Sequence, residues 1–481
     1  MYLGLDLGTS AVKACVIDDA GTVVAMASAP LSMSHPFPGA SEQTCDEWWA
    51  AICAAIQSID GQTRAGLRAI GLSGQMHGAV LLDAANAPIR PAILWNDGRA
   101  EAECADMARL DPEVGRLSGA PPMPGFTAPK LLWLSRFEPQ THRRIAHVLL
   151  PKDYVGFRLH GRFVTDPSDA AGTGWFDERA RCWSPRLCEI SATDPVWLPE
   201  VRYGSDVAGT LMPDAARALG LPTGIPVATG AGDAAAGAVG IGAIHDGDGF
   251  ISLGTSGQLF VTTNSYRPDP ENCLHAYAHC LPDRWFQMAA MLNGARPLAW
   301  FADLVGRKLE ELLAEAEVAR PGPLFLPYLT GERTPHGDAS IRAGFAFLDE
   351  STTQGSLMRS VVEAVAFTFV DAMDVFAAAG TRPDVLMAIG GGTRSDFLMQ
   401  MIADATGCRI VRTKGAETGP AFGAARLAKL SLREATEDIL TAPAVDREFH
   451  PDRTSGLFNR DRHAAFRSLY PALKGIGRPP Q

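Results

Sequence analysis

Two glycine turns of the same kind, one in each half of the chain, constrain the fold more than any other feature. They are Asp6-Leu7-Gly8-Thr9-Ser10 and Ser252-Leu253-Gly254-Thr255-Ser256-Gly257. Glycine lets a backbone approach an anion without a Cβ in the way, and the Thr and Ser residues add hydrogen-bond donors. Each turn joins two apolar stretches that are predicted to be strands, at 2–6, 11–17, 249–253 and 258–263.

A single turn of this type is weak evidence, because Gly-Thr-Ser is also common in ordinary hairpins. Its recurrence in the same strand context predicts two phosphate-binding turns that hold one polyphosphate from both sides. The chain has 481 residues, more than the roughly 250–300 at which one core stops growing. We therefore predict two domains of similar size, 1–244 and 245–481.

Charge and cysteine usage exclude several classes of protein. The net charge is −11 and Lys and Arg form no run of five or more, so we expect no binding to nucleic acid or to an anionic membrane. The nine cysteines are dispersed without a C-x-x-C pair, which indicates reduced thiols. The sequence has no signal peptide and no apolar stretch of about 18 residues, so we expect a soluble, cytoplasmic protein.

One group of residues has spacing that suits a metal. Cys273, His275, His279 and Cys280 could hold zinc, but the residues between them have the composition of a strand. Ordinary packing is the favoured interpretation of these four side chains.

The predicted elements follow the order β-β-β-α-β in the first half. A third strand is expected at 23–27, a capping-box pattern at Thr44 and Glu47 begins a helix, and a strand follows at 67–72. This order differs from a Rossmann unit, and no G-x-G-x-x-G or Walker motif occurs. The second half repeats the hairpin and is predicted to add a strand at 285–291, a helix at 357–379, a strand at 385–389 and a further helix.

Many segments, in order over nearly the whole chain, resemble the FGGY family of carbohydrate kinases within the actin/hexokinase-like ATPase superfamily. The turn at Asp6 marks only the superfamily, whereas Gln75-Met76-His77-Gly78 and Trp95-Asn96-Asp97-Gly98-Arg99 resemble family members that act on D-xylulose. The remaining matching segments are 124–130, 151–154, 168–173, 232–233, 251–257, 331–336 and 390–392.

This resemblance implies an α/β fold of two duplicated actin/hexokinase-like (ribonuclease H-like) domains with a cleft between them. It implies ATP-dependent phosphorylation of D-xylulose at its 5-hydroxyl, with ATP and Mg²⁺ in the cleft and a small-molecule sugar as the substrate. It also implies a homodimer.

Asp233 follows a predicted strand at 226–229 and two glycines, where a carboxylate can point into a cleft. It matches the family's catalytic base, which orients the acceptor hydroxyl and takes its proton; the alternative is a helix N-cap. Asp6 matches the second catalytic carboxylate, which organises Mg²⁺ directly or through water, and its alternative is turn capping.

The other site residues follow from the same matches. Met76 and His77 match the sugar-binding dipeptide, and Trp95 with its neighbours Asn96, Asp97 and Arg99 either adds to the sugar site or forms a turn with an Asp–Arg pair. Lys13 either reaches a phosphate or faces solvent. The phosphate contacts are expected from Gly8, Thr9, Ser10, Gly254 and Thr255, and the adenosine contacts from Gly391 and Gly392.

One departure from the family pattern bears on the substrate. The pattern has Asn immediately after the catalytic Asp, and this chain has Ala234. Another pentulose such as D-ribulose, or a sugar alcohol, is therefore an alternative substrate. A nucleotide-dependent regulatory protein of the actin type is a second alternative, against which Asp233 and the segment Gln75-Met76-His77-Gly78 argue.

Overall fold

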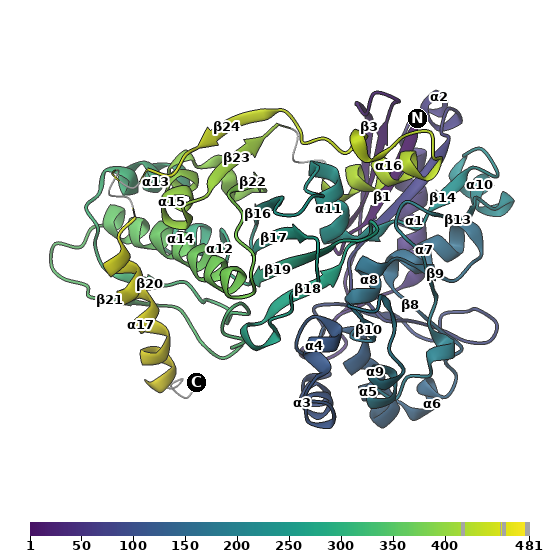
Figure 1. Ribbon diagram of the computed structural model, residues 1–481, viewed down its shortest axis with the longest axis horizontal. Coiled ribbons are helices and arrows are strands. Elements are labelled where there is room, and N and C mark those ends of the chain that lie inside the picture. The colour runs from purple at the N-terminus through teal and green to yellow at the C-terminus, as the bar shows by residue number, and fades with distance from the viewer. Residues whose placement is uncertain (415–418, 453, 455–457, 477–481) are drawn as a thin grey trace.

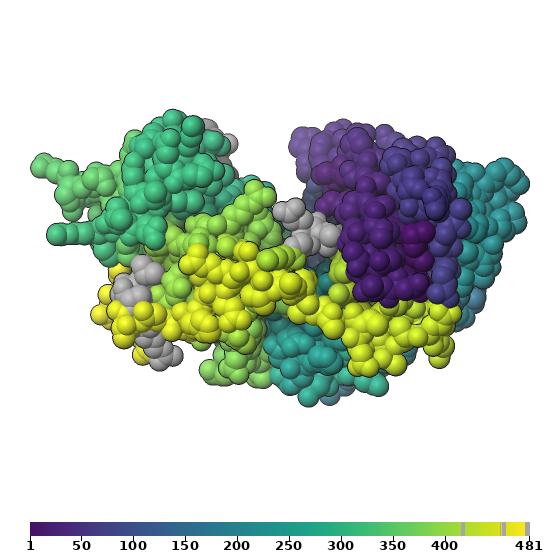
Figure 2. All heavy atoms as spheres, turned by 90° about the horizontal axis from the view of Figure 1, so that it is seen from above, coloured from purple at the N-terminus to yellow at the C-terminus, as the bar shows by residue number. Residues whose placement is uncertain are grey.

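Two β-sheets, each with helices on its faces, form the two halves of the molecule (Figure 1). The computed structural model describes residues 1–414, 419–452, 454 and 458–476. Between the N-terminal half and the C-terminal half lies a deep hollow (Figure 2). Each half carries one of the two glycine turns at the end of its first strand.

The first sheet has the strand order β13-β14-β5-β1-β2-β3, with β15 also paired to β5. β1 is antiparallel to β2 and parallel to β5, so the first turn joins an antiparallel hairpin at the centre of the sheet. Its strands are β1 (Tyr2–Leu7), β2 (Ala11–Ile17), β3 (Val23–Pro30), β5 (Ala69–Gly74), β13 (Val207–Thr210), β14 (Pro226–Ala228) and β15 (Ala231–Gly232).

The second sheet has the order β18-β19-β17-β16-β22-β23-β24. The middle strands of the two sheets, β3-β2-β1-β5-β14 and β19-β17-β16-β22-β23, correspond: in each sheet the first strand is antiparallel to the second on one side and parallel to a later strand on the other. The predicted duplication is therefore confirmed. The strands are β16 (Gly249–Leu253), β17 (Gly257–Thr263), β18 (Leu274–Ala278), β19 (Trp285–Met291), β22 (Val385–Ile389), β23 (Arg409–Thr413) and β24 (Val445–Phe449).

The capping signal at Thr44 marks the start of a helix as predicted, whereas the helix predicted at 357–379 begins three residues earlier, at Gln354. Thr44 is the N-cap of α1 (Cys45–Gln57) and accepts a hydrogen bond from the Glu47 N–H, although the Glu47 carboxylate contacts the Thr44 hydroxyl instead of its N–H. The long helix α14 (Gln354–Ala378) begins with a complete capping box between Thr353 and Ser356.

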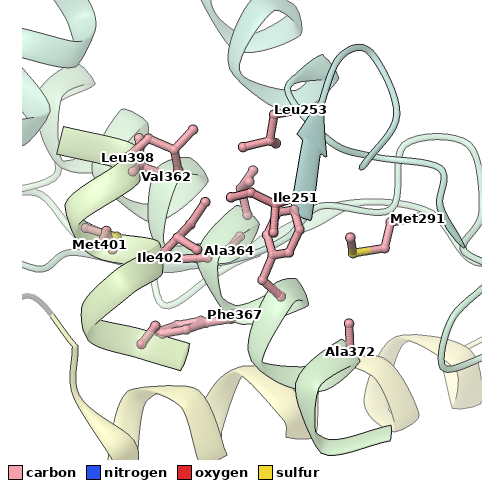
Figure 3. Close-up of a cluster of buried hydrophobic side chains, with 14 of the residues drawn as sticks. Ile251, Leu253, Met291, Val362, Ala364, Phe367, Ala372, Leu398, Met401 and Ile402 are labelled. Carbon is pink, nitrogen blue, oxygen red and sulfur yellow. The ribbon is translucent and has the colours of Figure 1, made fainter. Parts of the chain in front are cut away.

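Apolar residues of α14 and α15 (Asp396–Thr406) pack on the second sheet and form the core of this half. Figure 3 shows Val362, Leu398 and Ile402 gathered beside Ile251 and Leu253 of β16. Most side chains of α14 are buried, because α12 (Arg296–Val305) and α13 (Leu309–Val318) pack on it as well.

The first sheet is covered by α1 on one face and by α16 (Gly419–Ser431) on the other. α16 belongs to the C-terminal half of the sequence but lies against β1 and β5 (Figure 1). A Cβ on Gly4 would lie 1.9 Å from the Ala421 carbonyl oxygen, and one on Gly71 equally close to that of Ala424, so glycine is required for this close contact. A single cut of the chain therefore does not separate the two sheets together with their covering helices.

Smaller elements complete the fold. The helices inserted after β5 are α3 (Glu101–Leu110), α4 (Val114–Ser118), α5 (Thr127–Phe137), α6 (Pro139–His142), α7 (Pro151–His160), α8 (Pro167–Ala171) and α9 (Pro185–Ile190). Of these, α3, α4, α5, α6 and α9 lie at the lower end of the first half in Figure 1. The other helices are α2 (Gly61–Ala65), α10 (Pro213–Leu219), α11 (Asp233–Ile241) and α17 (Arg460–Ile476), and within the described ranges none has an apolar stretch that could cross a membrane. The short strands are β4 (Glu42–Gln43), β6 (Val80–Leu82), β7 (Ala92–Ile93), β8 (His147–Leu149), β9 (Val164–Thr165), β10 (Phe176–Asp177), β11 (Cys182–Trp183), β12 (Glu200–Val201), β20 (Leu324–Leu326) and β21 (Gly344–Ala346).

Candidate active site

Three parallel strands of the first sheet end at the same level. Their register aligns Leu7 of β1, Gly74 of β5 and Gly232 of β15. The residues that follow these strands are the first glycine turn, the segment Gln75-Met76-His77 and Asp233. The carboxyl ends of parallel strands are the usual place for a ligand site in α/β proteins, and here they bring together the candidates from distant parts of the sequence.

Asp6 lies in β1 directly opposite Lys13 of β2. Its carboxyl group is buried, and Oδ1 has no hydrogen-bond partner among the described residues. Burial raises the pKa of Asp6 to about 6, and the charge of Lys13 opposes that rise. Lys13 itself is exposed on the same face of the sheet as Asp6, since directly opposed residues of a pair point to one side.

Asp233 is the first residue of α11, and Gly232 occupies the N-cap position that was the alternative role for Asp233. Its side chain is open to the cleft, and Oδ1 accepts a hydrogen bond of 2.7 Å from the Ala234 N–H. Protein atoms around it displace part of its water and, together with the charge of Asp6, raise its pKa to about 7. The two carboxylates therefore influence each other's ionisation.

His77 has a left-handed backbone, with φ of 69°, and its ring stacks on Phe126. Its Nδ1 lies 2.5 Å from the Gly172 carbonyl oxygen. Burial lowers the pKa of His77 to about 3, so the ring is neutral near pH 7. Because a carbonyl oxygen can only accept, Nδ1 carries the proton and Nε2 is left as an acceptor for a hydroxyl group.

The side chain of Met76 is buried beneath the strand that leads to Asp233. A Cβ on Gly232 would lie 3.0 Å from Met76 Cγ, which shows how closely the two residues pack. A contact between Met76 and a sugar would therefore come from its backbone.

Trp95 and its neighbours differ in their contacts. Trp95, Asn96 and Asp97 line a cavity of about 410 Å³ together with His77, Phe126 and Arg333. Asp97 also accepts two hydrogen bonds of 2.8 Å from Arg99, and Arg99 binds Glu42 as well. The Asp97–Arg99 pair therefore has the structural role that the sequence offered as the alternative to a role in the sugar site.

The Thr9 hydroxyl is used within the protein. It donates to Gln75 Oε1 at 3.0 Å and accepts from Trp95 Nε1 at 2.9 Å, while Gln43 binds both the Thr9 carbonyl and Gln75. A contact from Thr9 to an anion would therefore use its backbone N–H. Gly8 is partly exposed and Ser10 is exposed at the tip of this turn.

The second sheet repeats the arrangement of the first. Parallel β16 and β22 align Ser252 with Ile389, so the turn at Gly254 and Thr255 lies beside Gly390–Gly392. Gly390 has φ of 95°, and a Cβ there would lie 2.6 Å from the Leu253 carbonyl oxygen.

A cavity of about 650 Å³ opens at this edge and is lined by Ser252, Gly391 and Arg412 among others, with Gly392 in the adjoining turn. Thr255 is exposed, and its hydroxyl makes no hydrogen bond to any residue that the structure describes. The residues of the second half that are predicted to bind the nucleotide, Gly254, Thr255, Gly391 and Gly392, therefore lie close together.

Sequence reasoning missed the supporting role of α8. Ser168 Oγ accepts a hydrogen bond from the Gly232 N–H at 3.1 Å, and Gly172 accepts from His77, so this short segment contacts both candidates. Behind it, the buried Lys152 ammonium lies 2.5 Å from Asp153, 3.2 Å from Asp166 and 3.5 Å from Asp169. In the sequence, segments 151–154 and 168–173 stand out only as family matches, and no local pattern indicates that they meet.

Of the four residues with metal-like spacing, His275 lies in β18 and packs its ring near Phe126 and Tyr277, whereas Cys273 lines the cavity beside His77. Across the described ranges no three His, Cys, Asp or Glu side chains converge as metal ligands.

Comparison with known proteins covers the whole chain. Residues 1–240 match the N-terminal domain of the FGGY family of carbohydrate kinases, and residues 249–432 match its C-terminal domain. The chain is 41% identical to a xylulose kinase of Escherichia coli over 98% of this chain and 99% of that protein, and 39% identical to one of Klebsiella pneumoniae over 99% and 100%. The crystal structure of a xyloylose kinase from Brucella ovis has a TM-score of 0.95 and 41% identity, and the match covers 99% of both chains. The chain therefore belongs to the FGGY family of carbohydrate kinases.

Proposed function

We propose that this kinase transfers the γ-phosphoryl group of ATP to the 5-hydroxyl of D-xylulose. The observation that carries the proposal is the convergence of Asp6, Asp233 and His77 at the carboxyl ends of β1, β15 and β5. The full-length similarity to proteins named xylulose kinase supports the choice of sugar.

The residues present fit a nucleotide with Mg²⁺. The two glycine turns would receive the phosphates from opposite sides of the cleft, and the cavity beside Gly391 would hold the adenosine, since a Cβ at Gly391 would meet nothing within 4 Å. Asp6 has a buried carboxylate oxygen without a protein partner and would hold Mg²⁺, directly or through water. When bound, Mg²⁺ supplies positive charge that offsets the phosphate oxygens.

Asp233 acts as the general base in this proposal. Its carboxylate accepts the proton of the 5-hydroxyl as the sugar oxygen forms a bond to the γ-phosphorus, and the bond from that phosphorus to the bridging oxygen breaks to release ADP. A base works best with a pKa near the working pH, and Asp233 has a pKa of about 7. Neutral His77 would accept a hydrogen bond from another sugar hydroxyl through Nε2 and so fix the sugar's orientation.

The hollow between the halves gives the reaction a means of excluding water (Figure 2). The sugar-binding residues lie mainly on the first sheet and the adenosine site on the second, so a closing motion would bring the two substrates together. Closure would also limit transfer of the phosphoryl group to water.

The test is ADP release by the purified protein, measured with D-xylulose, D-ribulose, D-arabitol and no sugar. We expect D-xylulose to give the highest kcat/KM and sugar-free ATP hydrolysis to be slow. Asp233→Ala should abolish sugar phosphorylation while ATP binding, measured by calorimetry, is retained. A preference for D-ribulose or D-arabitol would refute the substrate, and nucleotide turnover independent of any sugar would favour the regulatory alternative.

We also propose that the protein works as a cytoplasmic homodimer. Its nine cysteines are all free thiols, which suits a reducing compartment. Light scattering coupled to gel filtration tests the dimer, and a mass near 51.2 kDa would refute it.

A further inference from the structure

Arg333 lines the cavity near His77 and carries a charge that has no evident use within the protein. It comes from the C-terminal half, whereas His77, Trp95 and Phe126 line the opposite wall from the N-terminal half. Its positive charge contributes to the lowered pKa of His77, so the two side chains are close enough to interact. Arg333 therefore faces the candidate sugar site from across the cleft.

The guanidinium of Arg333 lacks a protein partner. No hydrogen bond or ion pair joins it to any described residue, although it is largely enclosed by protein. Arg99, on the neighbouring segment, is by contrast bound by Asp97 and Glu42 through its Nε and Nη2. A guanidinium has five N–H donors, and that of Arg333 lines the cavity, where a ligand can accept from them.

The neighbouring Glu332 does not neutralise Arg333 through an ion pair. Its Oε1 accepts hydrogen bonds from the Leu292 N–H at 2.6 Å and the Arg333 N–H at 2.8 Å, and its Oε2 accepts from Asn293 at 3.3 Å. Glu332 therefore fixes the backbone of the segment and leaves the guanidinium free to bind elsewhere.

This segment is also attached to the second glycine turn. Thr334 exchanges hydrogen bonds with Ala290 of β19, and Asn293 donates to the Gly331 carbonyl at 2.7 Å. The next residue, Gly294, donates from its N–H to the Thr255 carbonyl at 3.1 Å. A ligand held by Arg333 would thus be held by the half of the molecule that carries the second turn.

We propose that Arg333 is a substrate-binding residue that donates hydrogen bonds to the C1 hydroxyl and C2 carbonyl oxygens of the ketopentose. This inference rests on the proposed function. The cavity is lined by His77 but not by Asp233, so the sugar end inside it is the end remote from the reacting 5-hydroxyl. The planar guanidinium fork suits two neighbouring oxygens, which are O1 and O2 of a 2-ketose.

The experiment measures sugar binding by calorimetry with D-xylulose and with 1-deoxy-D-xylulose, which lacks O1. Arg333→Met should weaken D-xylulose binding about 10- to 100-fold, because it removes hydrogen bonds from a charged donor. The wild type should bind 1-deoxy-D-xylulose more weakly than D-xylulose. Arg333→Met should bind the two sugars about equally, since it lacks the guanidinium that O1 would contact. Arg333→Lys, which keeps the charge without the fork, should lie between the two.

Two controls separate binding from folding. Binding of a non-hydrolysable ATP analogue should be unchanged in Arg333→Met, which also shows that the variant is folded. Arg342→Met is the matched control, because Arg342 lies on the same segment and, among the residues that the structure describes, donates only to the backbone carbonyls of Ala339 and Ile341. It should bind D-xylulose as the wild type does.

Several results would overturn the assignment. Binding of D-xylulose by Arg333→Met within twofold of wild type would do so, as would an undiminished effect of O1 removal in that variant. Glu101 lines the same cavity. If Glu101→Gln weakens D-xylulose binding as much as Arg333→Met does, Arg333 acts through an ion pair across the cleft instead. If the wild type does not phosphorylate D-xylulose, the proposed function fails as well. If the wild type phosphorylates D-xylulose normally and Arg333→Met binds this sugar as the wild type does, only the assignment of Arg333 is overturned.

Discussion

The two carboxylates at the edge of the first sheet predict how activity depends on pH. Burial and the negative charge of Asp6 raise the pKa of Asp233 to about 7, and burial raises that of Asp6 to about 6. A general base must be ionised, so with both substrates well below their KM, where the rate reports the free enzyme, we expect the rate of D-xylulose phosphorylation to follow the ionised fraction of Asp233. That fraction is about one tenth at pH 6 and about nine tenths at pH 8, so the rate should change roughly tenfold across this range.

The perturbation that tests the cause is Asp6→Asn. Removing the negative charge of Asp6 should lower the pKa of Asp233, because the repulsion that opposes a second ionised carboxylate is lost. This variant is expected to be a poor kinase, so the pKa of Asp233 is measured directly by a ¹³C NMR titration of the free protein. Wild type and Asp6→Asn are compared under identical salt.

Stability gives an independent measurement with a defined sign. A carboxylate whose pKa is raised on folding stabilises the protein below its unfolded pKa, about 3.9, and loses that contribution as pH rises through its folded pKa. Asp233→Asn should therefore raise Tm at pH 8 and raise it less at pH 5. A flat kcat/KM profile between pH 6 and 8, or an Asp233 titration unaffected by Asp6→Asn, would refute the reasoning.

Four further predictions follow from single contacts. Thr255→Val should raise KM for ATP about 10-fold with little change in sugar binding, because an exposed hydroxyl near the phosphates is lost; unchanged ATP kinetics would contradict the role of the second turn. His77→Ala should lower kcat/KM for the sugar roughly 5- to 150-fold, whereas a defect confined to ATP would exclude a sugar contact. Ala234→Asn should improve D-xylulose phosphorylation if D-xylulose is the native acceptor, and slower turnover would indicate another sugar. Gly4→Ala should destabilise the protein by about 1–3 kcal/mol in urea unfolding, because its Cβ would meet α16, whereas Gly237→Ala, where a Cβ meets nothing within 4 Å, should not.

The strands and helices that the sequence predicted are those with local signals. The hairpins around Gly8 and Gly254 are specified by turn residues between apolar runs, and α14 by its spacing and its cap. The position of α16 has no such signal, because it depends on Gly4 and Gly71 meeting residues near 421 and 424. These contacts join parts of the chain that are far apart in the sequence. In the sequence they are visible only as a run of small residues.

The candidate site was predictable to the extent that its residues belong to short motifs. Asp233 and His77 could be named in advance, and the register of parallel strands explains why they meet. The partners that hold them, Ser168 and Gly172, could not be identified, since their hydrogen bonds to Gly232 and His77 arise only in the folded chain. For the same reason, the sequence places Arg333 in a segment that matches the family but does not indicate its role in the site.

The attachment of α16 to the first sheet has a consequence for the synthesis of the protein. During translation β1 and β5 leave the ribosome early, but the helix that covers one of their faces is completed only at Ser431. The apolar face of the first sheet therefore stays uncovered while almost the whole chain is made, and the N-terminal half cannot finish folding ahead of the C-terminal half. A polypeptide ending near residue 244 would lack that cover, so the two halves made as separate fragments should become active only when they are combined.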